Sequence, residues 1–186
     1  MTKKLPSIYL LRQLLRYDPD TGQLFWVPRT HAMFSATLGR TSQHSCSHWN
    51  SRYAGHEAFT SDNGDGYKQG RIFGAAFFAH RVAYALATGF WPSHEIDHID
   101  GDRSNNRLPN LRLASRSENQ CNTRMPKNNN SGVKGVSWSS KDKRWVAQIA
   151  ISGRRVAYKC FADFDQAKQY ADTERMRAHK EFARFE

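Results

Sequence analysis

The stretch His94-Glu95-Ile96-Asp97-His98-Ile99-Asp100-Gly101-Asp102 decides how the middle of this chain folds. A short run ending in an Asp-His pair is followed by a loop rich in Gly, Asp, Asn and Ser, and then by the apolar run Leu111-Arg112-Leu113-Ala114. Next comes Ser115-Arg116-Ser117-Glu118, a Ser-x-x-Glu capping box that predicts the start of a helix. The order strand, loop, strand, helix would bring four polar side chains toward one point: Asp97, His98, Asn110 and Asn119. We therefore expect an active site here.

The segment resembles the HNH nuclease motif, the ββα-metal finger, in the variant whose third position is Asn rather than His. The resemblance spans residues 94–119 with every key position filled. It implies that Asp97 and Asn119 bind a divalent ion, that His98 is the general base, and that Asn110 orients His98.

The chemistry of these residue types agrees with that assignment. A neutral His, with a reference pKa near ~6.5, can take a proton from water at pH 7. A hard ion such as Mg²⁺, with Mn²⁺ as the alternative, accepts oxygen ligands and keeps several waters. An Asn carbonyl that accepts from one ring nitrogen fixes the His tautomer. Two other interpretations stay open. One is a hairpin turn with a solvated His. The other is a calcium loop, but the pattern of alternating oxygen ligands that such a loop needs is interrupted at Asp97, Ile99 and Gly101.

The charge of the chain indicates a nucleic-acid partner. The sequence has 28 Lys and Arg against 17 Asp and Glu, a formal net charge of +11. Residues 1–102 carry 10 basic and 9 acidic side chains, whereas residues 103–186 carry 18 and 8. A basic half suits double-stranded DNA because binding is driven by counterion release. An anionic membrane is the competing partner, but no run approaches the ~20 apolar residues of a spanning helix and no signal-peptide core appears.

The N-terminal part predicts an α/β module. Apolar spacing predicts a helix over residues 8–16, stopped by the turn Tyr17–Gly22, and a strand over residues 23–27. Strands are expected between residues 53 and 78, with a hairpin turn at residues 62–66. A helix over residues 77–87 would end at Gly89, before Pro92. Similar phage-type HNH nucleases carry such a module, so the resemblance extends loosely over residues 5–92.

Two features of the N-terminal part leave alternatives open. His80-Arg81 opens the last of these helices, where it either touches a phosphate or packs beneath the finger. Residues 28–52 are polar and are predicted to be a loop. Within them, His44-x-Cys46-x-His48 could hold zinc, but a polar loop is the better interpretation, because three widely spaced cysteines without a Cys-x-x-Cys pair indicate neither a zinc knuckle nor a disulfide framework.

The C-terminal part predicts three strands and a helix after a basic, Asn-rich linker over residues 124–132. The strand-like runs cover residues 133–139, 144–151 and 154–161, and the helix covers 163–179 with Asp163 as its N-cap. Gly-Val-x-Trp, Trp-x-Ala-x-Ile and Phe-x-x-Phe-Asp-x-Ala resemble the plant ethylene-response-factor type of DNA-binding domain, whose sheet lies in the major groove. The residues that the resemblance or the local charge places on DNA are Lys134, Ser137, Gln148, Arg154 and Arg155.

That resemblance has departures. Ser137 and Ala150 stand at positions that are often Arg, and Tyr158-Lys159 replaces Leu-Gly, so the base preference of the family does not carry over. Trp138 and Trp145 either stack on bases or pack against the helix, and aromatic residues on a small sheet usually supply core.

The prediction is an α+β chain in three parts: a module over residues 1–92 that buttresses the nuclease, an HNH ββα-metal finger over 93–126, and a βββα DNA-binding domain over 127–186. We expect a monomeric, metal-dependent DNA endonuclease of the homing type, acting in the cytoplasm of a bacterial host if phage-encoded, without a membrane. The leading alternative is a sequence-specific DNA-binding regulator with an inactive finger. An RNA-binding protein is less favoured, because no stacking sheet of the RNP kind is evident.

Overall fold

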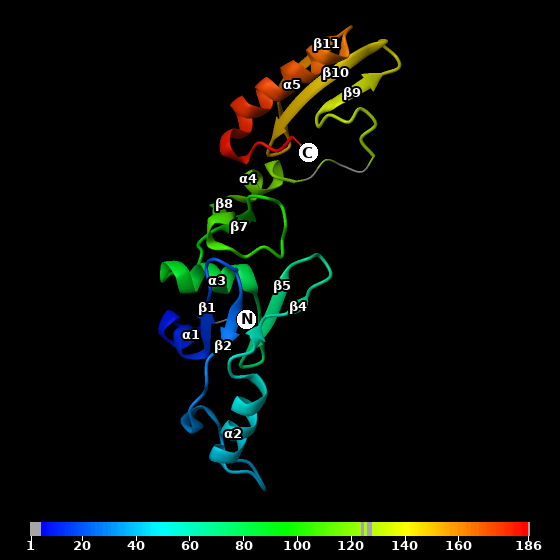
Figure 1. The fold of residues 1–186 in the computed structure, drawn as a ribbon. Helices are drawn as coiled ribbons and strands as arrows, with labels where there is room; N and C mark the ends of the chain where they lie inside the picture. The colour runs from blue at the N-terminus through cyan, green and yellow to red at the C-terminus, as the bar shows by residue number, and fades with distance from the viewer. Residues whose placement is uncertain (1–4, 124, 126–127, 186) are drawn as a thin grey trace. The chain divides into compact units, whose positions relative to one another are not determined.

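Two units make up the chain in a computed structural model that describes residues 5–123, 125 and 128–185 (Figure 1). They are Met1–Arg112 and Leu113–Glu186, each built from helices and small antiparallel sheets. This mixed architecture agrees with the predicted α+β class. The predicted boundary near residue 127 lies outside the described residues, as does the part of the predicted linker at 124, 126 and 127. The three-part division stays a prediction.

The first unit contains two three-stranded sheets, one ordered β1-β2-β3 and the other β4-β5-β6. It also contains the strand β7, which pairs with β8 (Leu111–Ala114), the strand in which the first unit ends. Its elements before β8 are α1 (Ile8–Leu14), β1 (Leu15–Tyr17), β2 (Leu24–Trp26), the 3-10 turn η1 (His31–Met33), α2 (Ser42–Tyr53), β3 (Glu57–Ala58), β4 (Ser61–Asp62), β5 (Lys68–Ile72), β6 (Ala75–Phe78), α3 (Ala79–Thr88), β7 (Glu95–His98) and η2 (Leu108–Asn110).

Large aliphatic side chains fill the core of this unit. Leu11, Leu14, Leu24 and Val82 are at most 2% exposed and bring α1, the first sheet and α3 together. A smaller cluster of Ala83, Ile96 and Leu111 packs α3 against β7 and β8. The helix α3 therefore packs against β7, the strand that contains Asp97 and His98.

Several local predictions are confirmed by the backbone. The turn at residues 62–66 joins β4 to β5, where the Asp62 carboxylate accepts from the Gly64 amide. Gly89 ends α3 with φ +84°, a conformation that favours glycine. The start of α3 differs from the prediction: Phe77 and Phe78 belong to β6, because they pair with β5 instead of continuing the helix.

The predicted loop over residues 28–52 is wrong, because α2 spans Ser42–Tyr53. Thr41 caps it by accepting from the His44 amide. Its inner face is tied to Arg29: the Asn50 side chain bonds both the amide and the carbonyl of Arg29, at 2.8 and 2.9 Å. Cys46 also donates to that carbonyl, at 3.1 Å. A helix with so few apolar residues is held by specific tertiary bonds that its own sequence pattern does not display.

The same helix excludes the zinc interpretation of His44-x-Cys46-x-His48. Residues two apart on a helix point in nearly opposite directions. Cys46 is buried, whereas His44 and His48 are exposed. Across the described residues, no group of three or more His, Cys, Asp or Glu side chains is arranged to hold a metal ion.

The second unit starts with the rest of β8 and α4 (Arg116–Cys121) and continues with a sheet ordered β11-β10-β9. The remaining elements are β9 (Val136–Ser139), β10 (Arg144–Ile151), β11 (Arg154–Phe161), α5 (Phe164–His179) and η3 (Lys180–Phe182). The capping box of α4 is confirmed: Ser115 Oγ accepts from the Glu118 amide, and Glu118 Oε2 accepts from the Ser115 amide at 2.7 Å. Asp163 is the N-cap of α5, as predicted.

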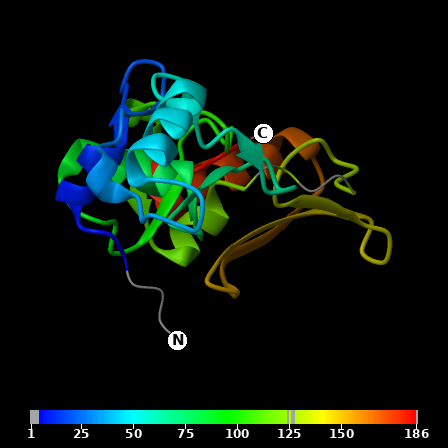
Figure 2. The ribbon, with the colours of Figure 1, turned by 90° about the horizontal axis from the view of Figure 1, so that it is seen from below.

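The helix α5 covers one face of the three-stranded sheet (Figures 1 and 2). Their shared core is built from small residues, with Ala147, Ala157, Ala167 and Ala171 all buried. Small side chains let the helix approach the sheet closely. Trp145 packs edge-on against Phe164, with ring centroids 4.7 Å apart, so its structural interpretation is favoured. Among the described residues, no helix is long and apolar enough to cross a membrane.

Candidate active site

His98 ends β7 as a buried side chain, only 4% exposed. Its Nε2 lies 3.2 Å from Oδ1 of Asn106, which is itself 2% exposed. Because an amide oxygen only accepts, this contact requires a proton on Nε2. The neutral ring then carries its lone pair on Nδ1. The contact thus selects one tautomer of His98.

Asn106 is held by the N-terminal segment of the same unit. The Tyr17 hydroxyl donates to the Asn106 carbonyl at 2.8 Å. Gly22, in the predicted turn, approaches the Asn106–Arg107 peptide so closely that a Cβ there would lie 2.6 Å from two backbone atoms. The pKa of Tyr17 is raised to about 12, mainly by burial and then by Asp18 and Asp20, so this hydroxyl stays a donor across the physiological range. Tyr17 and Gly22 therefore position Asn106, a contact of His98 that the sequence reasoning did not identify.

Asn110 closes the loop between the two strands. Its Oδ1 accepts from the Asp100 amide at 3.0 Å, and its Nδ2 donates to the Asp100 carboxylate at 2.9 Å and to the Asn105 carbonyl at 2.8 Å. Its backbone carbonyl accepts from the Ile99 amide at 2.9 Å. The amide group of Asn110 therefore clamps both ends of the loop that contains Asn106. Its predicted effect on His98 stays a prediction, and these bonds would transmit it through the loop.

Asp97 precedes His98 and is 3% exposed. Its Oδ2 accepts from Arg112 Nη2 at 2.7 Å and from Nε at 2.8 Å, so a guanidinium holds the carboxylate in one orientation. Asn119 is half-buried in α4, in the second unit, and offers an amide oxygen. Oxygen donors of this kind fit Mg²⁺ or Mn²⁺, which retain several waters and need few protein ligands. The joint ligation by Asp97 and Asn119 stays a prediction.

Aromatic rings surround His98. The His80 ring meets it edge-on with centroids 5.2 Å apart, and Tyr67 lies 5.9 Å away. Burial lowers the pKa of His80 to about 3, with help from the nearby charges of His98 and Arg81. Burial also lowers the pKa of His98, although Asn106 and the carboxylates of the loop act in the opposite direction. Both rings are therefore neutral at pH 7, and His80 packs beneath the site.

The residues assigned to DNA contact do not share one surface. Strand pairing places Ser137, Gln148 and Arg155 on the exposed face of the sheet, and a register shift after Ile149 brings Arg155 onto that face. The Arg155 guanidinium lies 4.7 Å from the ring centre of Tyr158, which pairs with Gln148. Arg154 is exposed at the start of β11.

Lys134 is directed elsewhere. Its Nζ donates to the carbonyls of Cys121 and Thr123, at the C-terminal end of α4. A cation at that end compensates the unpaired carbonyls of the last turn.

Comparisons with known proteins agree with the location of this site. The model of the HNH endonuclease family matches residues 77–121, which include His80, Asp97, His98, Asn106 and Asn110. Protein 3.8 of Escherichia phage T7 is 37% identical over 107 residues, which cover 57% of this chain and 88% of that protein. No solved structure matches. Neither match identifies a homing-type enzyme or a C-terminal domain of the ethylene-response-factor type.

Proposed function

Because the chain belongs to the HNH endonuclease family, we propose that it is a metal-dependent endonuclease that hydrolyses phosphodiester bonds of DNA with His98 as general base. The observation that carries this proposal is the contact of His98 with Asn106. His98 directly follows the buried Asp97 in the chain. A ring that is buried, neutral and held in one tautomer is prepared to accept a proton.

The proton transfer assigned to His98 follows from its tautomer. With Nε2–H directed to Asn106, Nδ1 is the atom that would take the proton from the attacking water. The resulting imidazolium would keep its bond to the amide oxygen and would be stabilised by Asp97, Asp100 and Asp102, whose charges raise the pKa of His98. These carboxylates therefore favour the product of the proton transfer.

Asp97 and Asn119 are the residues that would hold the divalent ion. When bound, such an ion neutralises charge on the phosphate and on the leaving oxygen. Arg112 holds the Asp97 carboxylate through its Oδ2, so the side chain does not have to be ordered when the ion arrives. Mg²⁺ is the preferred candidate, with Mn²⁺ as the alternative, because both donors are oxygen atoms.

The C-terminal sheet is proposed to bind duplex DNA through Ser137, Gln148 and Arg155, with Arg154 at its border. Their common exposed face and the basic second half of the chain support this role. The homing-type role rests on the resemblance alone, and a monomer with one such site would cut one strand at a time.

The second candidate is a DNA-binding regulator whose finger is inactive. The salt bridge between Arg112 and Asp97 is the observation that favours it, since a guanidinium already balances the proposed metal-binding carboxylate.

A plasmid assay separates the two candidates. We expect the protein to nick supercoiled plasmid with Mg²⁺ and not with EDTA, and His98→Ala to bind the plasmid without nicking it. Binding without cleavage by the unmodified protein, with Mg²⁺ and also with Mn²⁺, would favour the regulator.

A further inference from the structure

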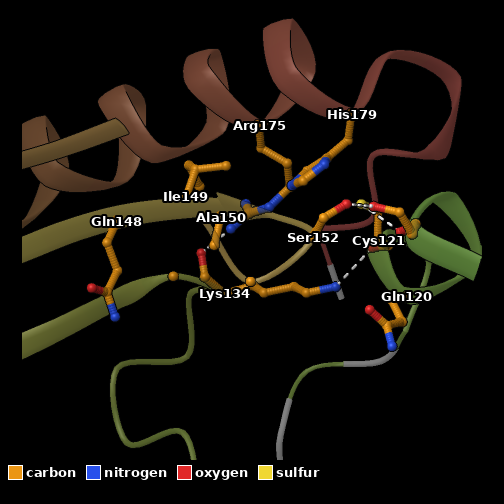
Figure 3. Close-up of a pocket in the computed structure, with 12 residues that line it drawn as sticks. Gln120, Cys121, Lys134, Gln148, Ile149, Ala150, Ser152, Arg175 and His179 are labelled. Carbon is orange, nitrogen blue, oxygen red and sulfur yellow. Dashed lines mark hydrogen bonds between the residues drawn. The ribbon is translucent and has the colours of Figure 1, made fainter. Parts of the chain in front are cut away.

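A cavity of about 210 Å³ lies within the second unit (Figure 3). Ser117, Gln120 and Cys121 of α4 line one side, and Arg175 and His179 of α5 line another. The end of β10 and the turn at Ser152 complete the wall. The nuclease function proposed above makes no use of this cavity.

Basic groups dominate the cavity. Lys134, Arg175 and His179 all line it, while no Asp or Glu is among its lining residues in the described part of the chain. Burial lowers the pKa of Lys134, and the Arg175 charge lowers it further. Burial also lowers the pKa of His179, followed by the charges of Arg175 and Lys134. Three basic side chains that disfavour one another's charge create a field that an anion would relieve.

Part of this cluster has a structural explanation. Lys134 caps the carbonyls at the end of α4, and Arg175 donates to the Lys134 carbonyl and to Asp172. These bonds account for the positions of Lys134 and Arg175. They do not account for the cavity between them or for His179.

Further hydrogen-bonding groups face the same space. Nδ1 of His179 is buried without a hydrogen-bond partner among the described residues. The hydroxyls of Ser152 and Ser117 are 2.7 Å apart and come from a strand turn and from α4. The amide of Gln120 adds a donor at the rim (Figure 3). A buried polar atom without a partner is costly unless water or a ligand supplies one.

We propose that this cavity binds a phosphate group. Cations, hydroxyls and amide N–H groups around a space without carboxylates match an acceptor that carries negative charge on several oxygens. A phosphate of the DNA backbone and free inorganic phosphate share this chemistry. The DNA source rests on the proposed nuclease function, whereas the site itself does not.

The position of the site gives it a consequence for α4. Ser117, Gln120 and Asn119 are on this one short helix, and Lys134 holds its C-terminal end. A phosphate in the cavity would bind α4 and the C-terminal sheet at once. It would thereby restrict the helix that carries the proposed metal ligand Asn119.

The first experiment measures phosphate binding without metal or DNA. Thermal unfolding of the full chain is compared in phosphate and in chloride at equal ionic strength. Because a ligand of the folded state stabilises it, we expect phosphate to raise Tm by roughly 2–5 °C. Gln120→Glu places a carboxylate at the cavity and should abolish that rise, whereas Gln169→Glu, the same change on the exposed side of α5, should retain it.

Two outcomes would overturn the site: no phosphate-specific rise in the unmodified chain, or an equal rise in Gln120→Glu. Should Gln120→Glu fail to fold, Ser152→Asp in the exposed turn makes the same test. If Ser152→Asp keeps the phosphate-specific rise in Tm, the proposal is equally overturned.

The second experiment identifies the source of the phosphate. Duplex DNA is titrated in EDTA, so that the result does not depend on cleavage. If a backbone phosphate occupies the cavity, Gln120→Glu should weaken binding about three- to tenfold more than Gln169→Glu, the order of one charged contact. Equal affinities together with a lost Tm rise would assign the cavity to free phosphate. Failure of the plasmid assay would remove the nuclease proposal and leave both of these results unchanged.

Discussion

The buried His98 and the half-buried His179 both have lowered pKa values, yet the surrounding side chains have opposite charge. Around His98 lie Asp97, Asp100 and Asp102, which oppose the effect of burial on its pKa. Around His179 lie Lys134 and Arg175, which add to the effect of burial. The acidic surroundings suit a metal cation and an imidazolium, and the basic surroundings suit an anion. The proposed metal site would use the first kind of surroundings, and the proposed phosphate site would use the second.

The largest effect is expected from Asp97→Ala, which would remove the carboxylate on which the acidic site depends. Cleavage should be abolished, since Asp97 is the charged ligand proposed for the ion. Stability should also fall by roughly 2–4 kcal/mol, because the partly exposed Arg112 guanidinium loses its bonds to the Asp97 carboxylate. Plasmid cleavage at limiting Mg²⁺ and urea unfolding measure the two effects.

A double variant separates those effects. Asp97→Ala with Arg112→Met also removes the guanidinium that bonds Asp97, and it should recover much of the stability without recovering cleavage. Normal cleavage by Asp97→Ala at limiting Mg²⁺ would show that the ligand assignment is wrong.

His98→Ala should lower the cleavage rate by about 10²- to 10⁴-fold, the usual contribution of a positioned base. Metal and DNA binding should persist. In the unmodified protein the rate should climb with pH and level off below the pH expected for an exposed histidine, because burial lowers the pKa of His98. Recovery of His98→Ala at high Mg²⁺ would make His98 a metal ligand instead of the base.

The neutral His80 beneath the acidic site predicts a pH-dependent stability. Its pKa is about 3 in the folded chain against an ordinary value of 6.5, so the unfolded chain binds the proton first as the pH falls. This contribution is complete above pH 6.5 and should decline by up to about 1.4 kcal/mol per pH unit below it. Urea unfolding between pH 4 and 7 measures it. His80→Leu should flatten the slope, whereas His44→Leu on the exposed face of α2 should not.

Asn106→Ala should reduce cleavage by about tenfold, because a mobile ring loses part of the benefit of a positioned base. Asn110→Ala should have a similar, indirect effect by loosening the loop. Gly22→Ala offers a remote test, since its Cβ would press on the Asn106–Arg107 peptide at 2.6 Å. Single-turnover rates at saturating Mg²⁺ measure all three variants. If Asn106→Ala cleaves at the full rate, the contact between Asn106 and His98 serves folding alone.

The smallest effects are expected at the basic residues of the second unit, and they should differ in kind. Arg155→Ala should weaken DNA binding several-fold and reduce the salt dependence by about one charge, because its side chain is exposed on the sheet. Lys134→Ala should lower stability more than affinity, because its Nζ caps the end of α4. Binding isotherms at two salt concentrations and urea unfolding distinguish the two. If Arg155→Ala lowers mainly stability and Lys134→Ala lowers mainly DNA affinity, the roles assigned to the two residues are wrong.

Patterns carried by neighbouring residues were predicted from the sequence. The capping box at Ser115 and Glu118, the helix end at Gly89 and the N-cap Asp163 all appear as expected. Each depends on bonds or backbone angles within a few residues, so local chemistry is sufficient. The Asp-His pair and its loop were found in the same way.

Contacts between distant residues decided the rest. Asn50 and Cys46 tie the helix α2 to Arg29, and the tautomer of His98 depends on Asn106, which Tyr17 holds across 89 positions of the chain. Lys134 was assigned to DNA from the resemblance to the ethylene-response-factor type of domain, and tertiary packing turns its Nζ to the carbonyls of α4. The sequence by itself determined which side chains carry charge and which segments repeat a local pattern. Only the tertiary structure decided which of those charges meet, because pairing depends on the closure of long loops that no local pattern encodes.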